Sequence, residues 1–239
     1  IVLVHAIRKR QRPQYSLSWF LVMTVVAGIG LLGGLHWYYS ARALADAQNE
    51  YEAALAHYLS SEREEKPAHE VTLTHAFYIG KYEVTQEQYM AAMMRWLDLT
   101  REEYDDIFNP SEFKGRDRPV DRIQCKEADI FCETVSEWTD WVVRLPTEAE
   151  WERACRAGTK TAYYTGDAET DLDRAGWYGK NSERTTHPVG QKAPNAWGLY
   201  DMHGNVNEYC ADTFRTYKAE AVVDPQGRRR FREEVFRGG

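Results

Sequence analysis

The segment from Gly158 to Cys210 constrains the fold more than any other part of this sequence, because it interrupts both helix and strand patterns. Glycine, asparagine, aspartate and proline recur there at short intervals, with aromatic residues between them. The first four favour turns, whereas the aromatic side chains provide apolar surface that a disordered linker lacks. A folded segment with few backbone ladders needs other means of stabilisation, and bound metal or disulfides are the usual ones.

Regular structure is predicted upstream of this segment. Residues 70–85 alternate apolar and polar side chains around Gly80, which predicts two short strands. Thr85 and Gln88 then form the capping-box pattern that opens a helix over residues 86–97.

Two further helices are predicted between residues 125 and 158. Residues 125–138 carry apolar side chains at helical spacing, with Cys132 on the buried face. Thr147 and Glu150 form a second capping box, which opens a short helix that stops at Gly158.

Residues 17–35 form a charge-free apolar stretch, long enough to cross a hydrocarbon core as a helix. Acidic residues dominate after it, and basic residues precede it: Arg8, Lys9, Arg10 and Arg12. The positive-inside rule therefore places the N-terminus in the cytoplasm and the rest of the chain outside. The alternative is a cleaved signal peptide with a small-residue site at 43–47, although the apolar run exceeds the usual signal core.

These features predict four parts along the chain. They are a cytoplasmic basic segment over 1–16, a transmembrane helix over 17–39, a helical stalk or disordered linker over 40–67, and a domain over 68–239, which the family resemblance given below implies is incomplete at its C-terminus. The predicted protein is thus single-pass, with its domain in the periplasm or outside the cell.

Charge and cysteine content exclude two classes of function. The net charge of −7 argues against a nucleic-acid partner, which needs a basic face to neutralise phosphates. The four cysteines lack the C-x-x-C spacing of a zinc knuckle; they are Cys125, Cys132, Cys155 and Cys210. An exported domain could oxidise them, and the sequence leaves their pairing open.

Several separate motifs resemble the formylglycine-generating enzyme (sulfatase-modifying factor) family. They are "FYIGKYEVTQEQY", "NPSEFKG", "RPV", "RLPTEAEWERACRAGT", "HPVGQKAPNAWGLYDMHGNVNEYC" and the terminal "FRGG", in the family's order over roughly residues 69–239. The resemblance implies an α+β fold of C-type-lectin-like type with little regular secondary structure. The sequence departs from the family pattern at residues 205–210, where "NVNEYC" stands in place of "NVWEWC".

The resemblance also implies structural calcium. The family stretch that matches 201–208 wraps Ca²⁺, so Asp201 and Glu208 would supply side-chain oxygens, and Gly204 and Val206 main-chain carbonyls. Six to eight hard oxygens are what Ca²⁺ prefers. Asn181 matches a side-chain ligand of the family's second calcium site. Without the resemblance, turn capping and a surface salt bridge would explain Asp201 and Glu208.

Two functions from different classes follow. The resemblance implies a membrane-anchored oxidase that converts a cysteine of a sulfatase or other peptide to formylglycine, with two cysteines binding Cu⁺ as soft thiolates. That cysteine pair is expected after Gly239, so no catalytic residue is assigned within the chain. The alternative is a non-catalytic C-type-lectin-like module that binds a ligand or partner, because one fold serves both.

Overall fold

The computed structural model describes residues 4–8, 67–98, 109–214, 216–227 and 234–239. These fall almost entirely within one compact unit, made of residues 1–9, 70–215 and 220–239, and the description that follows is of this unit. Of the second unit, residues 10–69 and 216–219, only 67–69 and 216–219 are described. The predicted membrane segment lies outside the described residues. Within them, no helix combines the length and apolarity that a membrane crossing requires.

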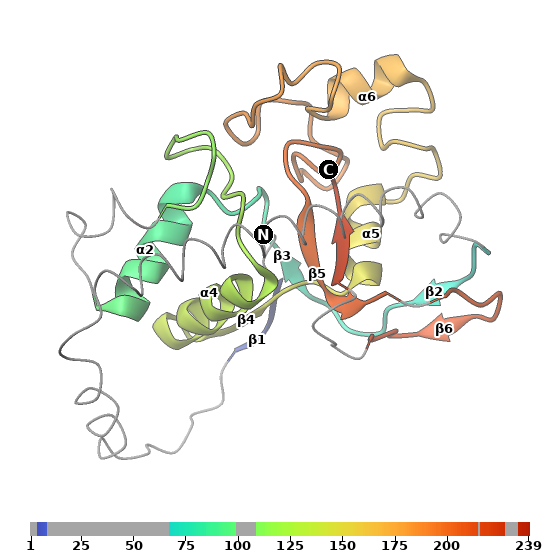
Figure 1. The fold of residues 1–239 in the computed structure, drawn as a ribbon. Helices are drawn as coiled ribbons and strands as arrows, with labels where there is room; N and C mark the ends of the chain where they lie inside the picture. Colours follow the sequence, from blue (N-terminus) through green and yellow to red (C-terminus); the bar gives the residue numbers. More distant parts are fainter. Residues whose placement is uncertain (1–3, 9–66, 99–108, 215, 228–233) are drawn as a thin grey trace. The chain divides into compact units, whose positions relative to one another are not determined.

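A three-stranded antiparallel sheet draws its strands from distant parts of the chain. Strand β1 (Val4–Arg8) lies between β3 (Tyr78–Ile79) and β4 (Trp141–Arg144), as Figure 1 shows. The ladder from β1 to β4 shifts register between His5 and Arg8. The sequence analysis did not anticipate a strand in residues 4–8, and the domain boundaries that it predicted stay predictions.

Two small two-stranded sheets complete the strand pairing among the described residues. Strand β2 (Val71–Thr72) pairs in parallel with β6 (Val222–Val223). Strand β5 (Glu208–Thr213) pairs antiparallel with β7 (Glu234–Arg237). Two short strands, β2 and β3, do form within 70–85 as predicted, but both precede Gly80 and each pairs with a remote strand.

The two longer helices begin and end where the sequence predicts. Helix α2 (Gln86–Leu97) opens with a complete capping box between Thr85 and Gln88. Helix α4 (Cys125–Trp138) buries its apolar side, and Cys132 is 4% exposed. The two helices pack together, and α4 packs against β4 (Figure 1). One apolar cluster lies among these elements. Its buried members are Val84, Tyr89, Ala92, Met93, Val120, Ile123, Cys125, Ala128, Phe131, Cys132, Val143, Leu145 and Tyr209.

Helix α5 (Glu148–Arg156) supports the other half of the core. It opens with the predicted capping box between Thr147 and Glu150 and ends at Ala157, which has φ 45°. It packs against β5 and β7 around a second apolar cluster (Figure 1). The buried members are Trp151, Ala154, Cys155, Leu199, Met202, Cys210 and Val235.

The segment from Gly158 to Cys210 contains one short helix, α6 (Glu169–Ala175), which the sequence analysis missed. Turns and bends occupy most of the rest, up to the start of β5. The described chain is thus an α+β fold with little regular structure in this segment, as predicted.

Candidate metal site

The turn before β5 has an unusual backbone. Asp201 and Asn205 have φ values of 57° and 71°, in the left-handed region that residues other than glycine rarely adopt. Such conformations cost about 1–2 kcal/mol per residue. They persist where the surrounding structure determines them, and they concentrate at functional sites.

Gly204 allows this turn to approach another backbone segment. A Cβ atom on Gly204, which has φ 133°, would lie 2.1 Å from the carbonyl oxygen of Trp177. A Cβ atom on Gly176 would lie 1.6 Å from the carbonyl oxygen of His203. The Asn205 N–H donates to the Trp177 carbonyl at 2.8 Å, which fixes the contact. Two glycines therefore permit a main-chain junction that no side chain could enter.

The carboxylate of Asp201 is buried and has one oxygen held in place. Its Oδ2 accepts the Gly190 N–H at 2.6 Å, whereas its Oδ1 is buried without a hydrogen-bond partner. The residue has 0% exposure, and burial raises the pKa of its carboxyl above the ordinary value.

Glu208, the first residue of β5, has the same arrangement. Its Oε2 accepts the indole N–H of Trp151 at 2.8 Å, and its Oε1 is buried without a hydrogen-bond partner. The residue also has 0% exposure. Burial, with the nearby charge of Asp201 adding to it, raises the pKa of the Glu208 carboxyl to about 7.

The two oxygens without partners, Asp201 Oδ1 and Glu208 Oε1, are ligands of the kind that a hard cation such as Ca²⁺ binds. A buried polar atom without a partner is costly and calls for an explanation such as an ion. Gly238 lies against two oxygens, because its Cβ would be 3.4 Å from the Val206 carbonyl oxygen and 3.6 Å from Glu208 Oε1. Within the described ranges, no three His, Cys, Asp or Glu side chains are grouped as a metal site. A cation here would therefore need main-chain carbonyls as well as Asp201 and Glu208.

Asn181 closes a local loop. Its Oδ1 accepts the Tyr178 N–H at 2.7 Å, and its Nδ2 donates to the Gly176 carbonyl at 3.1 Å and to Asp173 Oδ1 at 3.3 Å. These contacts span residues 173–181 and do not involve Asp201 or Glu208. Its assignment to a second calcium site stays a prediction.

Glu83 is a third buried carboxylate, and sequence reasoning missed it. It lies between β3 and α2 with 1% exposure. Burial raises the pKa of its carboxyl well above the ordinary value, and the charges of Glu208 and Asp201 add to this effect. The alternating pattern gave no signal, because Glu83 and its neighbour Val84 are both buried.

Comparison with known proteins decides the family. The model of the sulfatase-modifying factor enzyme 1-like domain matches residues 38–239. The chain belongs to the formylglycine-generating enzyme family. The resemblance of the motifs to this family is thereby confirmed.

Relatives of this family member carry different names. It is 34% identical over 184 residues to chaperone protein LppX of Paenibacillus barcinonensis, which covers 56% of this chain and 61% of that protein. It is 35% identical over 144 residues to the formylglycine-generating enzyme of Streptomyces coelicolor, which covers 54% of this chain and 44% of that enzyme. The chain thus spans less than two thirds of the length of both relatives.

A solved structure supports the same fold. Treponema denticola variable protein 1 superposes with a TM-score of 0.54 and 29% sequence identity, over 65% of this chain and 69% of that chain.

The cysteines of this family member lie in its two apolar clusters. All four are buried, in two groups: Cys125 and Cys132 in the first apolar cluster, and Cys155 and Cys210 in the second. Burial raises the pKa of the Cys155 thiol to about 12, and it also raises that of Cys210 well above the ordinary value. In the absence of a bound metal, such thiols stay protonated and are poor nucleophiles.

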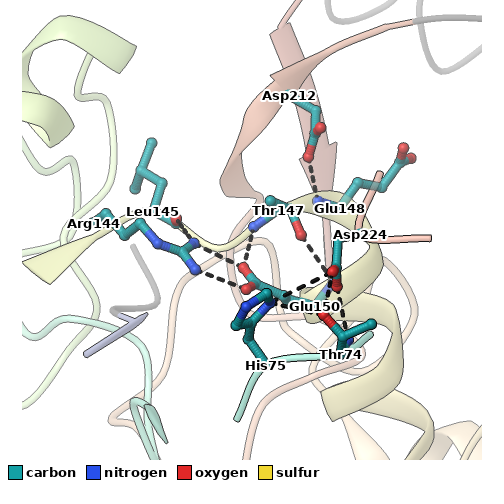
Figure 2. Close-up of polar contacts among 9 residues, drawn as sticks. All are labelled: Thr74, His75, Arg144, Leu145, Thr147, Glu148, Glu150, Asp212 and Asp224. Carbon is teal, nitrogen blue, oxygen red and sulfur yellow. Dashed lines mark hydrogen bonds and ion pairs between the residues drawn. The ribbon is translucent and has the colours of Figure 1, made fainter. Parts of the chain in front are cut away.

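A second polar network lies at the start of α5 and is structural. Arg144 donates to both carboxylate oxygens of Glu150, at 2.8 and 2.7 Å, and Glu150 accepts the Thr147 N–H, as Figure 2 shows. The Glu148 N–H donates to Asp212 Oδ2 at 2.5 Å (Figure 2). These bonds satisfy N–H groups at the beginning of the helix and tie it to β4 and β5.

Figure 2 also draws a separate contact near the surface. The N–H and hydroxyl of Thr74 both donate to the carboxylate of Asp224, and His75 lies 3.4 Å from the same carboxylate. Because the Thr74 bonds join the residues after β2 and β6, this contact extends their parallel pairing.

Proposed function

We propose that Asp201 and Glu208, with the carbonyls of Gly204 and Val206, hold a structural Ca²⁺. The supporting observation is the pair of buried, orphaned oxygens, Asp201 Oδ1 and Glu208 Oε1. In each carboxylate the other oxygen is held by an N–H donor, which orients the group as outer-shell donors orient metal ligands. Bound calcium supplies positive charge that compensates buried carboxylates.

The calcium proposal is tested by thermal unfolding of the 239-residue chain with and without a chelator. Calcium at about 100 times its Kd should stabilise the fold by about 2.7 kcal/mol. Asp201→Asn should abolish the chelator-sensitive part of the melting temperature. Asp140→Asn makes the same change at an exposed site and should leave that part intact. Equal melting curves of the parent chain with and without chelator would contradict the proposal that calcium stabilises the fold.

We further propose that the protein containing this domain oxidises a peptide cysteine to formylglycine. Membership of the family and the likeness to the Streptomyces coelicolor enzyme support this. In this reaction the cysteine Cβ becomes an aldehyde, the sulfur leaves as hydrogen sulfide, and O₂ is reduced to water and the aldehyde oxygen with two electrons from a thiol reductant. No step of this reaction is assigned to the four cysteines of this chain.

A non-catalytic binding module is the second candidate. One relative, chaperone protein LppX, is named for a role other than oxidation. In this role the C-type-lectin-like fold would present a ligand- or partner-binding surface.

One assay tests whether this chain is sufficient for catalysis. The 239-residue chain is incubated with a Cys-x-Pro-x-Arg peptide, Cu⁺, reductant and O₂, and the peptide is analysed by mass spectrometry. We expect no conversion by this chain, because its own thiols are buried. Copper-dependent conversion of thiol to aldehyde would contradict that expectation. Retention of unconverted peptide on the immobilised chain would support the binding module.

We also propose, from the sequence alone, that residues 17–35 anchor the chain in a membrane. A single crossing would separate residues 4–8 from the domain, so the pairing of β1 with β3 and β4 and an anchored domain outside the cytoplasm are alternatives. Extraction of membranes with alkaline carbonate should leave the chain in the pellet. Release into the supernatant with a new N-terminus near Asp46 would identify a cleaved signal peptide instead.

A further inference from the structure

Glu83 connects a distant part of the chain to the turn of the candidate metal site. Its Oε2 accepts a hydrogen bond from Asn205 Nδ2 at 2.7 Å, and its Oε1 accepts the Val206 N–H at 3.2 Å. More than 120 residues separate Glu83 from these two donors. One buried carboxylate thus uses both oxygens to hold two consecutive residues of the turn.

The peptide unit that Glu83 holds lies between the two carbonyls assigned to calcium. The Gly204 carbonyl precedes it, and the Val206 carbonyl follows it. Asn205 is fixed on its other side, because its Oδ1 accepts the His187 N–H at 2.8 Å and its Nδ2 also donates to the His187 carbonyl at 3.1 Å. The side-chain amide of Asn205 therefore cannot rotate by 180° without losing these bonds. Its Nδ2 group is held in the orientation that donates to Glu83.

We infer that Glu83 is a positioning residue for the metal site: it fixes the Asn205–Val206 peptide so that the carbonyls of Gly204 and Val206 are aimed at the ion. This inference rests on the calcium site proposed above. Outer-shell groups of this kind typically alter metal affinity by about 10–100-fold when they are removed.

The charge at Glu83 is what distinguishes this role from simple turn packing. None of the ion pairs among the described residues includes Glu83, Asp201 or Glu208. Three neighbouring buried carboxylates repel one another and are costly to desolvate. A neutral side chain could hold a turn without that cost, whereas a third carboxylate is favourable when positive charge is bound beside it.

The test measures Ca²⁺ affinity and stability separately in the 239-residue chain. Glu83→Gln keeps the size of the side chain but turns an N–H₂ group toward one of its two donors. Glu83→Asp keeps the charge but shortens the reach to both donors. Glu133→Gln makes the same chemical change as Glu83→Gln at an exposed position of α4, and it serves as the matched control. Calcium binding is followed by isothermal titration calorimetry, and melting is recorded in chelator and in calcium.

We expect Glu83→Gln to raise the Kd for Ca²⁺ by about 10–100-fold, with a smaller loss of melting temperature in chelator than in calcium. Glu83→Asp should also raise the Kd, because position as well as charge is lost, and Glu133→Gln should not change it. Unchanged Kd in both Glu83 variants, or an equal loss of melting temperature with and without calcium, would overturn the positioning role. Absence of calcium binding by the parent chain would instead overturn the proposed site, and this role with it.

Discussion

Replacing Glu150 by glutamine tests whether the charged network at the start of α5 stabilises the fold. The side chain of Glu150 is 11% exposed and that of Arg144 is 37% exposed. A glutamine oxygen in the place of Oε2 would keep the bonds to the Thr147 N–H and to Arg144 Nη1, but its amide nitrogen would face Arg144 Nη2. The change therefore removes one charge-assisted bond and the negative charge.

A hydrogen bond to a charged group contributes about 1.5–3 kcal/mol. Water competes for the partly exposed guanidinium of Arg144, so the loss is at the low end of this range. We therefore expect Glu150→Gln to lower the free energy of unfolding by about 1.5–2 kcal/mol. The matched control is Glu152→Gln on the same helix, because its pair with Arg156 is about half exposed on both sides. Loss of that pair should cost under about 0.5 kcal/mol. Urea unfolding at pH 7 measures both free energies.

The pH dependence gives the sharper test. Burial alone would raise the pKa of Glu150, but the bonds from Arg144 and from the Thr147 N–H outweigh it, so the pKa is lowered. The stability contributed by a group of this kind is present above its unfolded pKa and is lost as the pH falls through the folded value. The difference in unfolding free energy between the parent chain and Glu150→Gln should therefore shrink below about pH 4. A difference of the same size at pH 7 and pH 3 would refute the reasoning.

Two further outcomes are expected from the site and its core. Gly204→Ala should lower the free energy of unfolding by at least about 2 kcal/mol, because strain at its φ adds to a clash with the Trp177 carbonyl. Gly179 has open space around it, so Gly179→Ala should change this free energy by under about 0.5 kcal/mol. Denaturant titration measures both. Iodoacetamide should leave Cys155 and Cys210 unmodified in the folded chain at pH 7.5 and alkylate them in urea, because burial raises their pKa values; rapid labelling of the native chain, seen by mass spectrometry, would contradict their burial.

The helices were predictable because their signals are local. Thr85 with Gln88, and Thr147 with Glu150, lie three residues apart, and both capping boxes form as predicted. The strand pairings were not predictable, because β1 and β3 come from opposite sides of a long intervening segment. No periodicity within either strand specifies that partner.

The candidate site likewise contains residues that the sequence predicted and residues that it did not. Asp201 and Glu208 came from the match to a family motif, and the structure finds both buried, each with one orphaned oxygen. Trp151 and Glu83 could not be found from the sequence, because each reaches the turn from a remote element. Asn181 was assigned from a loose match, and its described bonds serve its own loop.

The remote origin of the site residues has a consequence for how the chain is made. During vectorial synthesis, Glu83 and Trp151 emerge before the turn whose groups they contact, 122 and 57 residues later. The capping boxes of the helices need only local contacts, whereas the site closes only through contacts of high sequence separation, which are slow to form. An ion that binds only the closed turn would shift this late step toward the native state. The calcium concentration that the emerging chain meets would then control the yield of completed domain, rather than the formation of its helices.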